Sequence, residues 1–91
     1  MLALTRQVGE TVVIKDVYRF TVESINHGIS AIIKFENQQD AVIEYLEFAV
    51  GEPIQVFDEL SMRVVQFRGN GVRIAWDAPR EWHAYRAEKR P

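Results

Sequence analysis

The sequence predicts an all-β fold in which short antiparallel strands form a small barrel or sandwich. Three observations support this prediction. Apolar and polar residues alternate with a period of two, β-branched residues gather in short runs, and turn-forming residues recur at intervals of roughly 8–12 residues. The chain has 91 residues, a length that suits a single domain spanning residues 1–91.

Four strands are expected in the first part of the chain. In residues 2–7, Leu2, Leu4 and Arg6 share one face of an extended segment. A β-branched run follows at 12–14, and residues 20–25 alternate again. Asn26-His27-Gly28 then predicts a hairpin turn that leads into an apolar strand at 29–35.

Residues 40–50 allow two interpretations. Asp40 could cap a short helix that ends at Gly51, because four residues would share one helical face: Val42, Tyr45, Leu46 and Ala49. Residues 41–45 read equally well as a strand, since periodicity cannot decide the structure of a short apolar run. This segment is the only place where we expect a helix, and it could hold at most a short one.

The second half of the chain returns to strands. Alternation predicts strands at 62–67, 72–76 and 82–86. Asn70-Gly71 indicates a tight hairpin between the first two, and 77–79 forms the next turn. Trp76 is expected in the core, whereas Trp82 could be buried or could stack on a base.

Composition excludes several classes of protein. The chain has no cysteine, so disulfide scaffolds, thiol nucleophiles and Cys-ligated metals are ruled out, and two histidines are too few for most zinc sites. No apolar run is long enough to span a bilayer, and we expect a cytoplasmic protein. No catalytic motif is recognisable, so the sequence indicates a protein that is not an enzyme and needs no cofactor or metal.

The net charge of −2 conceals an asymmetry. Residues 1–50 carry 4 basic and 7 acidic side chains, whereas residues 51–91 carry 7 basic and 6 acidic ones. Six of those seven basic residues are arginines. An excess of arginine at one end of the chain is compatible with nucleic-acid binding even though the total is negative.

The two halves also resemble each other. A shift of 42 residues places Gly9-Glu10 on Gly51-Glu52 and superimposes the apolar positions of the two halves, with five identities over 41 positions. This register predicts two repeat units, 1–50 and 51–91, that share one core.

Two blocks of sequence resemble the carbon storage regulator A (Csr/Rsm) family of bacterial translational regulators. The first is the opening Leu2-Ala-Leu-Thr-Arg6 followed by Gly9-Glu10, and the second runs from Gly69-Asn70-Gly71-Val72-Arg73-Ile74 to Ala78-Pro79-Arg80-Glu81. The resemblance implies a Csr-like fold, either as an internally duplicated pseudo-dimer or as a homodimer. It also implies binding to GGA-containing hairpin loops in mRNA leaders, with control of translation or mRNA stability, and possible sequestration by small RNAs.

The resemblance also implies a site. In that family the first strand of one subunit lies beside the last strand of the other, and the matching positions here are Leu4, Thr5, Arg6, Pro79, Arg80, Ala84, Tyr85 and Arg86. The chain departs from the family at Gln7 and Tyr85, lacks a second copy of the first strand, and leaves no room for a C-terminal helix. By the shift of 42 residues, Glu44 stands where the first unit would carry the counterpart of Arg86. We therefore expect one RNA site, built from Arg6 and Arg86.

Two alternatives stay open. Arg68 and Arg73 could contact phosphate or could be ordinary surface charges. The chain could instead be a protein-binding module or antagonist that has lost much of its RNA affinity, as the acidic first half suggests. An exposed edge at 41–45 could then recruit another chain by strand addition.

Overall fold

The computed structural model describes residues 2–51, 53–57 and 59–89. Within these residues the chain forms β-strands and one short 3₁₀ helix, η1 (Ala87–Lys89). The strands are β1 (Leu2–Gln7), β2 (Thr11–Ile14), β3 (Tyr18–Asn26), β4 (Ser30–Asn37), β5 (Val42–Ala49), β6 (Ile54–Phe57), β7 (Leu60–Arg68), β8 (Gly71–Asp77) and β9 (Ala84–Arg86). No helix in the described part is long and apolar enough to cross a membrane.

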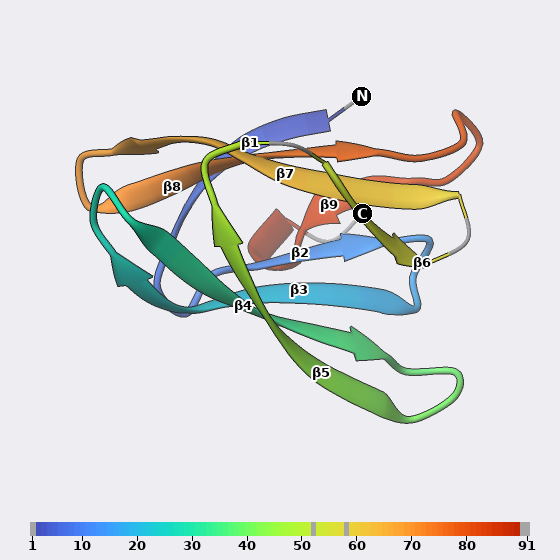
Figure 1. Cartoon of the computed structure of the whole chain (residues 1–91). Helices are drawn as coiled ribbons and strands as arrows, with labels where there is room; N and C mark the ends of the chain where they lie inside the picture. Colours follow the sequence, from blue (N-terminus) through green and yellow to red (C-terminus); the bar gives the residue numbers. More distant parts are fainter. Residues whose placement is uncertain (1, 52, 58, 90–91) are drawn as a thin grey trace.

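The strands form two antiparallel sheets that lie as separate layers (Figure 1). The four-stranded sheet has the order β1-β8-β7-β6, and the five-stranded sheet has the order β5-β4-β3-β2-β9. The prediction of an all-β fold is confirmed. Of the two architectures expected, the closed barrel is wrong, because both sheets keep open edges.

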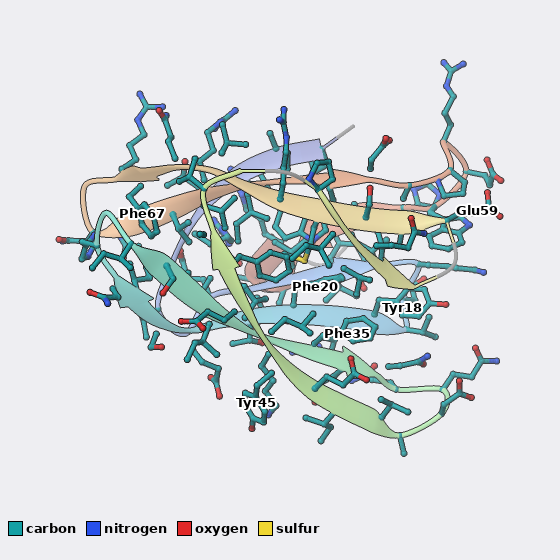
Figure 2. The ribbon with its side chains drawn as sticks, in the orientation of Figure 1. Tyr18, Phe20, Phe35, Tyr45, Glu59 and Phe67 are labelled. Atoms are coloured by element: carbon teal, nitrogen blue, oxygen red, sulfur yellow. The ribbon has the colours of Figure 1, made fainter. Side chains whose placement is uncertain are left out.

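One core fills the space between the layers. Alternate residues of β2, β3 and β4 face β7 and β8, as the period of two requires. Phe20 lies between the layers, close to Phe35 (Figure 2). Its ring centroid is 5.1 Å from that of Phe35 and 5.8 Å from that of Trp76. Trp76 is only 2% exposed, which confirms its predicted place in the core.

The ends of the chain exchange partners between the sheets. β1 begins the first half of the sequence but pairs with β8 of the second, with Leu2 opposite Trp76 and Gln7 opposite Gly71. β9, near the other end, crosses to β2, where Tyr85 lies opposite Val13. Each sheet is therefore completed by a strand from the other half of the chain.

The two halves share pairing registers that are 42 residues apart. Val12 lies opposite Phe20 between β2 and β3, and Ile54 lies opposite Met62 between β6 and β7. The next hairpins both shift register at corresponding places, between Val22 and Ser24 and between Val64 and Gln66. Repeat units with these boundaries stay a prediction, which the matching registers support.

The spacing changes after these hairpins, because the second loop is one residue shorter. Asn26 pairs with Ser30, but Arg68 pairs with Gly71. Ile33 lies opposite Val22, and Ile74 lies opposite the corresponding Val64. The structural counterpart of Ile74 is therefore Ile33, and not Ile32 as a uniform shift would give.

Residues 42–49 form strand β5, so the strand interpretation of this segment is confirmed and the helical one is wrong. The side chain of Asn37 organises the preceding turn, since its Oδ1 accepts hydrogen bonds from the backbone N–H groups of Gln39 (3.1 Å) and Asp40 (3.3 Å). Asp40 is thus part of a hairpin turn and not a helix cap. The turn brings the chain back antiparallel to β4, and β5 forms backbone hydrogen bonds with β4.

The C-terminal segment also differs from expectation. β9 begins at Ala84, two residues later than predicted, because the N–H of Trp82 closes a turn on the carbonyl of Pro79 at 3.0 Å. The short 3₁₀ helix η1 follows it, where no helix was expected. Trp82 packs against the core beside Tyr18, with the Lys15 ammonium 4.5 Å from its ring.

Candidate nucleic-acid interface

Arg6, the first predicted site residue, points into the space between the sheets. It lies opposite Val72, a core residue, and is only 6% exposed. Its Nε donates a hydrogen bond to the carbonyl of Thr5 at 3.0 Å, and its Nη1 donates to the two carboxylate oxygens of Glu88 at 3.3 and 3.2 Å. Glu10 lies 3.8 Å from Nε. Such a buried guanidinium needs internal partners, and Glu88 supplies a negative charge.

Arg86, the second predicted arginine, also faces inward. It lies opposite Val12 of the core and is half-buried. Glu88 follows two residues later, in the short helix η1, which contacts β2. A backbone hydrogen bond at Glu88, the hydrogen bond from Arg6 and the positive charges of Arg6 and Arg86 hold the pKa of this carboxyl below its usual value. One carboxylate therefore interacts with both arginines that the sequence singled out.

A pocket of about 180 Å³ opens between the edges of the two sheets. Three predicted residues line it: Pro79, Arg80 and Ala84. Leu2 of β1 and Trp76 of the core complete much of the wall. The indole Nε1–H of Trp76 is buried and has no hydrogen-bond acceptor among the described residues.

The structure does not bring all of the predicted residues together. Leu4 lies opposite Ile74 and faces the core. Its neighbour Thr5 faces outward on the four-stranded sheet, since successive side chains of a strand point to opposite faces. Tyr85 points outward from the five-stranded sheet, where its hydroxyl donates to Asp16 Oδ1 at 2.7 Å.

The expected pairing of the first and last strands needs correction. β1 and β9 are not hydrogen-bonded neighbours; β1 pairs with β8, and β9 pairs with β2. They border the same opening from opposite sheets, and the Arg6–Glu88 ion pair joins β1 to η1, the helix that follows β9. Glu88 is not among the predicted site residues, although an acidic residue two positions after a predicted binding arginine is a signal that could have identified it.

The arrangement offers cationic groups and a partly apolar pocket. Among the described residues, no group of three or more His, Asp or Glu side chains is placed to hold a metal ion. No protein-family model, curated protein or solved structure matches this chain. The resemblance to the Csr/Rsm family therefore stays a prediction from two sequence blocks.

Proposed function

We propose that this protein is a post-transcriptional regulator that binds GGA-containing hairpin loops in mRNA leaders at the opening between β1 and β9. One observation carries the proposal: Arg6 of β1 binds the Glu88 carboxylate, and the positive charge of Arg86, two residues before Glu88 in the chain, also acts on that carboxylate. Small RNAs with the same loops would compete for the site. Bound to a leader, the protein would exclude the ribosome or change the stability of the message.

The Glu88 carboxylate occupies the position that an RNA group would take. A guanidinium fork binds a carboxylate and a phosphate with the same bidentate geometry, and it also binds the O6/N7 edge of guanine. Sequence-specific RNA recognition relies on unstacked loop bases, which can enter pockets and hydrogen-bond to their walls. The pocket beside Leu2, Pro79 and Ala84 would receive such a base.

Glu88 would therefore act as an internal competitor. Its side chain is 49% exposed, whereas that of Arg6 is 7% exposed, so the carboxylate can leave toward solvent while the guanidinium stays in place. RNA binding would replace one charge-assisted contact of Arg6 with another. This exchange keeps the buried guanidinium paired in both states.

The test is a fluorescence anisotropy titration with a GGA hairpin and with the same hairpin carrying a changed loop. Arg86→Ala should weaken binding of the GGA hairpin about tenfold or more, since a bidentate base contact is worth roughly 1–3 kcal/mol. Glu88→Gln should strengthen it, because the competing charge is gone. Lys34→Gln removes one positive charge from the opposite side of the molecule and serves as the matched control.

The proposal would be wrong if neither the wild type nor Glu88→Gln prefers the GGA loop. Equal affinities for the wild type and Arg86→Ala would also contradict it. Sedimentation of the free protein and of the complex completes the test. We expect a pseudo-dimeric monomer, because one chain already completes both sheets; a homodimer would have twice the mass.

A second candidate function, binding of a protein partner, is favoured by the first half of β5. This edge strand leaves Val42, Ile43 and Tyr45 exposed, the last two at 55% and 61%. In Figure 2, Tyr45 points away from the space between the layers. An exposed apolar edge can add a strand from another chain. NMR titration with a lysine-rich strand peptide should shift the β5 amides if this function operates, and Ile43→Lys should abolish the shifts.

A further inference from the structure

The outer face of the four-stranded sheet carries three arginines. Met62 and Val64 of β7 and Ile74 of β8 belong to the core, so the residues between them point away from it. Arg63 and Arg73 are therefore on the outer face. Beyond the register shift in β7, Phe67 packs against the core, which places Arg68 on the outer face as well.

The pairing register sets these arginines close together. Arg63 lies opposite Ala75, and Gln66 lies opposite Arg73. Arg73 is thus a diagonal neighbour of both Arg63 and Arg68, and diagonal neighbours are separated by about 7–8 Å. The three side chains form a short track across β7 and β8, which we call the arginine track (Arg63, Arg68 and Arg73).

The arginine track lacks internal compensation. In the described part of the chain, none of its guanidinium groups forms a salt bridge or a side-chain hydrogen bond. The acidic residue nearest in register is Asp77, two positions beyond Ala75 on the same face. On the outer face of the other sheet, by contrast, Lys34 pairs with Glu36 at 3.9 Å. Like charges held on adjacent strands repel one another, so an anionic ligand would stabilise this face.

The surroundings of the arginine track indicate which kind of anion it would bind. Its neighbours on the face are small or polar: Ala3, Thr5, Gln7, Gln66 and Ala75. None of these five side chains is aromatic or large and apolar, so they provide no platform for base stacking and no apolar wedge for a lipid layer. Arginine, glutamine and threonine side chains are common donors to phosphate oxygens.

We propose that the arginine track binds the phosphodiester backbone of RNA without regard to its sequence. The inference rests on the proposed function and extends it. β1 connects the two sites, because it turns Arg6 inward to the candidate loop site and Thr5 and Gln7 outward beside the arginine track. One RNA would thus bind with its loop bases in the opening between β1 and β9. The phosphates of its flanking strand would bind the arginine track on the sheet face.

The experiment measures RNA affinity over a series of salt concentrations for the wild type and for the double variant Arg63→Gln/Arg68→Gln. Each lost phosphate contact with a single strand lowers the slope of log K against log salt by about 0.7, so the double variant should lose about 1.4. Its preference for a GGA loop over a changed loop should equal that of the wild type. Lys34→Gln should retain the full slope, and Asp77→Asn should bind more tightly at low salt.

The outcomes separate the two proposals. A wild type that prefers the GGA loop while the double variant keeps its full salt slope would overturn the arginine track alone. A wild type without loop preference, whose salt slope still falls in the double variant, would support the arginine track and overturn the proposed function. Anionic phosphatidylserine vesicles provide the competing ligand. Wild-type binding to them that is lost in the double variant, with an unchanged RNA slope, would assign the face to a membrane and overturn the inference.

Discussion

At the scale of single residues, burial of Arg6 couples stability to pH through Glu88. The pKa of Glu88 is lowered in the folded state, so its contribution to stability is present above the usual glutamate pKa. It is lost as the pH falls through the lowered value of the folded state, where the carboxyl becomes protonated and Arg6 loses its charged partner. Below the usual glutamate range the fold should therefore become more sensitive to urea.

Glu88→Gln tests this coupling. The variant should lose stability relative to the wild type at neutral pH, and the difference should shrink as the pH is lowered through the acidic range. Urea midpoints measured at several pH values give the comparison, with Glu81→Gln as the control on an exposed carboxylate. If the urea midpoints of Glu88→Gln and of the wild type change with pH in parallel, the ionised Arg6–Glu88 pair does not stabilise the fold.

Gly71 allows the close approach of β1 to β8. A Cβ at this position would lie 2.9 Å from the backbone oxygen of Arg6 and 3.0 Å from Thr5 Cγ2. Gly71→Ala should therefore push β1 away and destabilise the fold by about 1–3 kcal/mol, as for other overpacked sites. Chemical denaturation measures the loss, and Asn70→Ala in the same turn should have a much smaller effect. A Gly71→Ala variant as stable as the wild type would mean that β1 can shift at little cost.

At the scale of elements, the turn between β4 and β5 contains backbone strain. Ala41 has a φ of 55°, in the left-handed region that costs a residue with a Cβ roughly 1–2 kcal/mol. Ala41→Gly should raise the free energy of unfolding by about 1 kcal/mol, less the added entropy of the unfolded chain. Ala49→Gly, inside β5, should lower it by about 0.5–1 kcal/mol. If Ala41→Gly and Ala49→Gly changed the free energy of unfolding in the same direction, the assigned turn would be contradicted.

The sequence predicted some elements and not others for physical reasons. The segment 2–7 was assigned correctly, because a buried face leaves a clear period of two. The strand at 62–67 was also predicted, although the register shift between Val64 and Gln66 turns Phe67, and not Gln66, toward the core. Residues 42–49 lacked this pattern, since both faces of the first half of β5 are exposed. β6 is four residues long and was not assigned as a strand; only the repeat register marked Ile54 and Val56.

The candidate site was predictable as a set of residue types but not as a geometry. Arg6 and Arg86 could be named from the sequence; Arg6 binds Glu88, and the charge of Arg86 helps to lower the pKa of the same carboxyl. The face of the sheet to which Thr5 and Tyr85 point depends on the registers of β1 and β9. A shift of one residue would turn each side chain to the opposite face. Register is set by pairing with β8 and β2, strands distant in sequence, so local patterns do not contain it.

At the scale of the whole molecule, the exchange of β1 and β9 makes each half depend on the other. Residues 1–50 alone would leave β1 without β8 and would expose the core face of β2, β3 and β4. We expect separate peptides 1–50 and 51–91 to be unfolded and an equimolar mixture to recover the fold. Proton–nitrogen correlation spectra measure this directly. A dispersed spectrum from either peptide alone would show that one sheet folds without the other.

The exchange of strands also has a consequence for the order in which the protein can form during its synthesis. β1 leaves the ribosome before β2, but its partner β8 emerges only after β7, and the partner of β2, β9, emerges later still. The hairpins β2–β3 and β3–β4 can pair early, whereas the four-stranded sheet is complete only when β8 has emerged and the five-stranded sheet only when β9 has emerged. Such distant pairing slows folding. Each nascent chain therefore carries β1 unpaired until β8 has emerged, and a neighbouring chain on the same message could capture it.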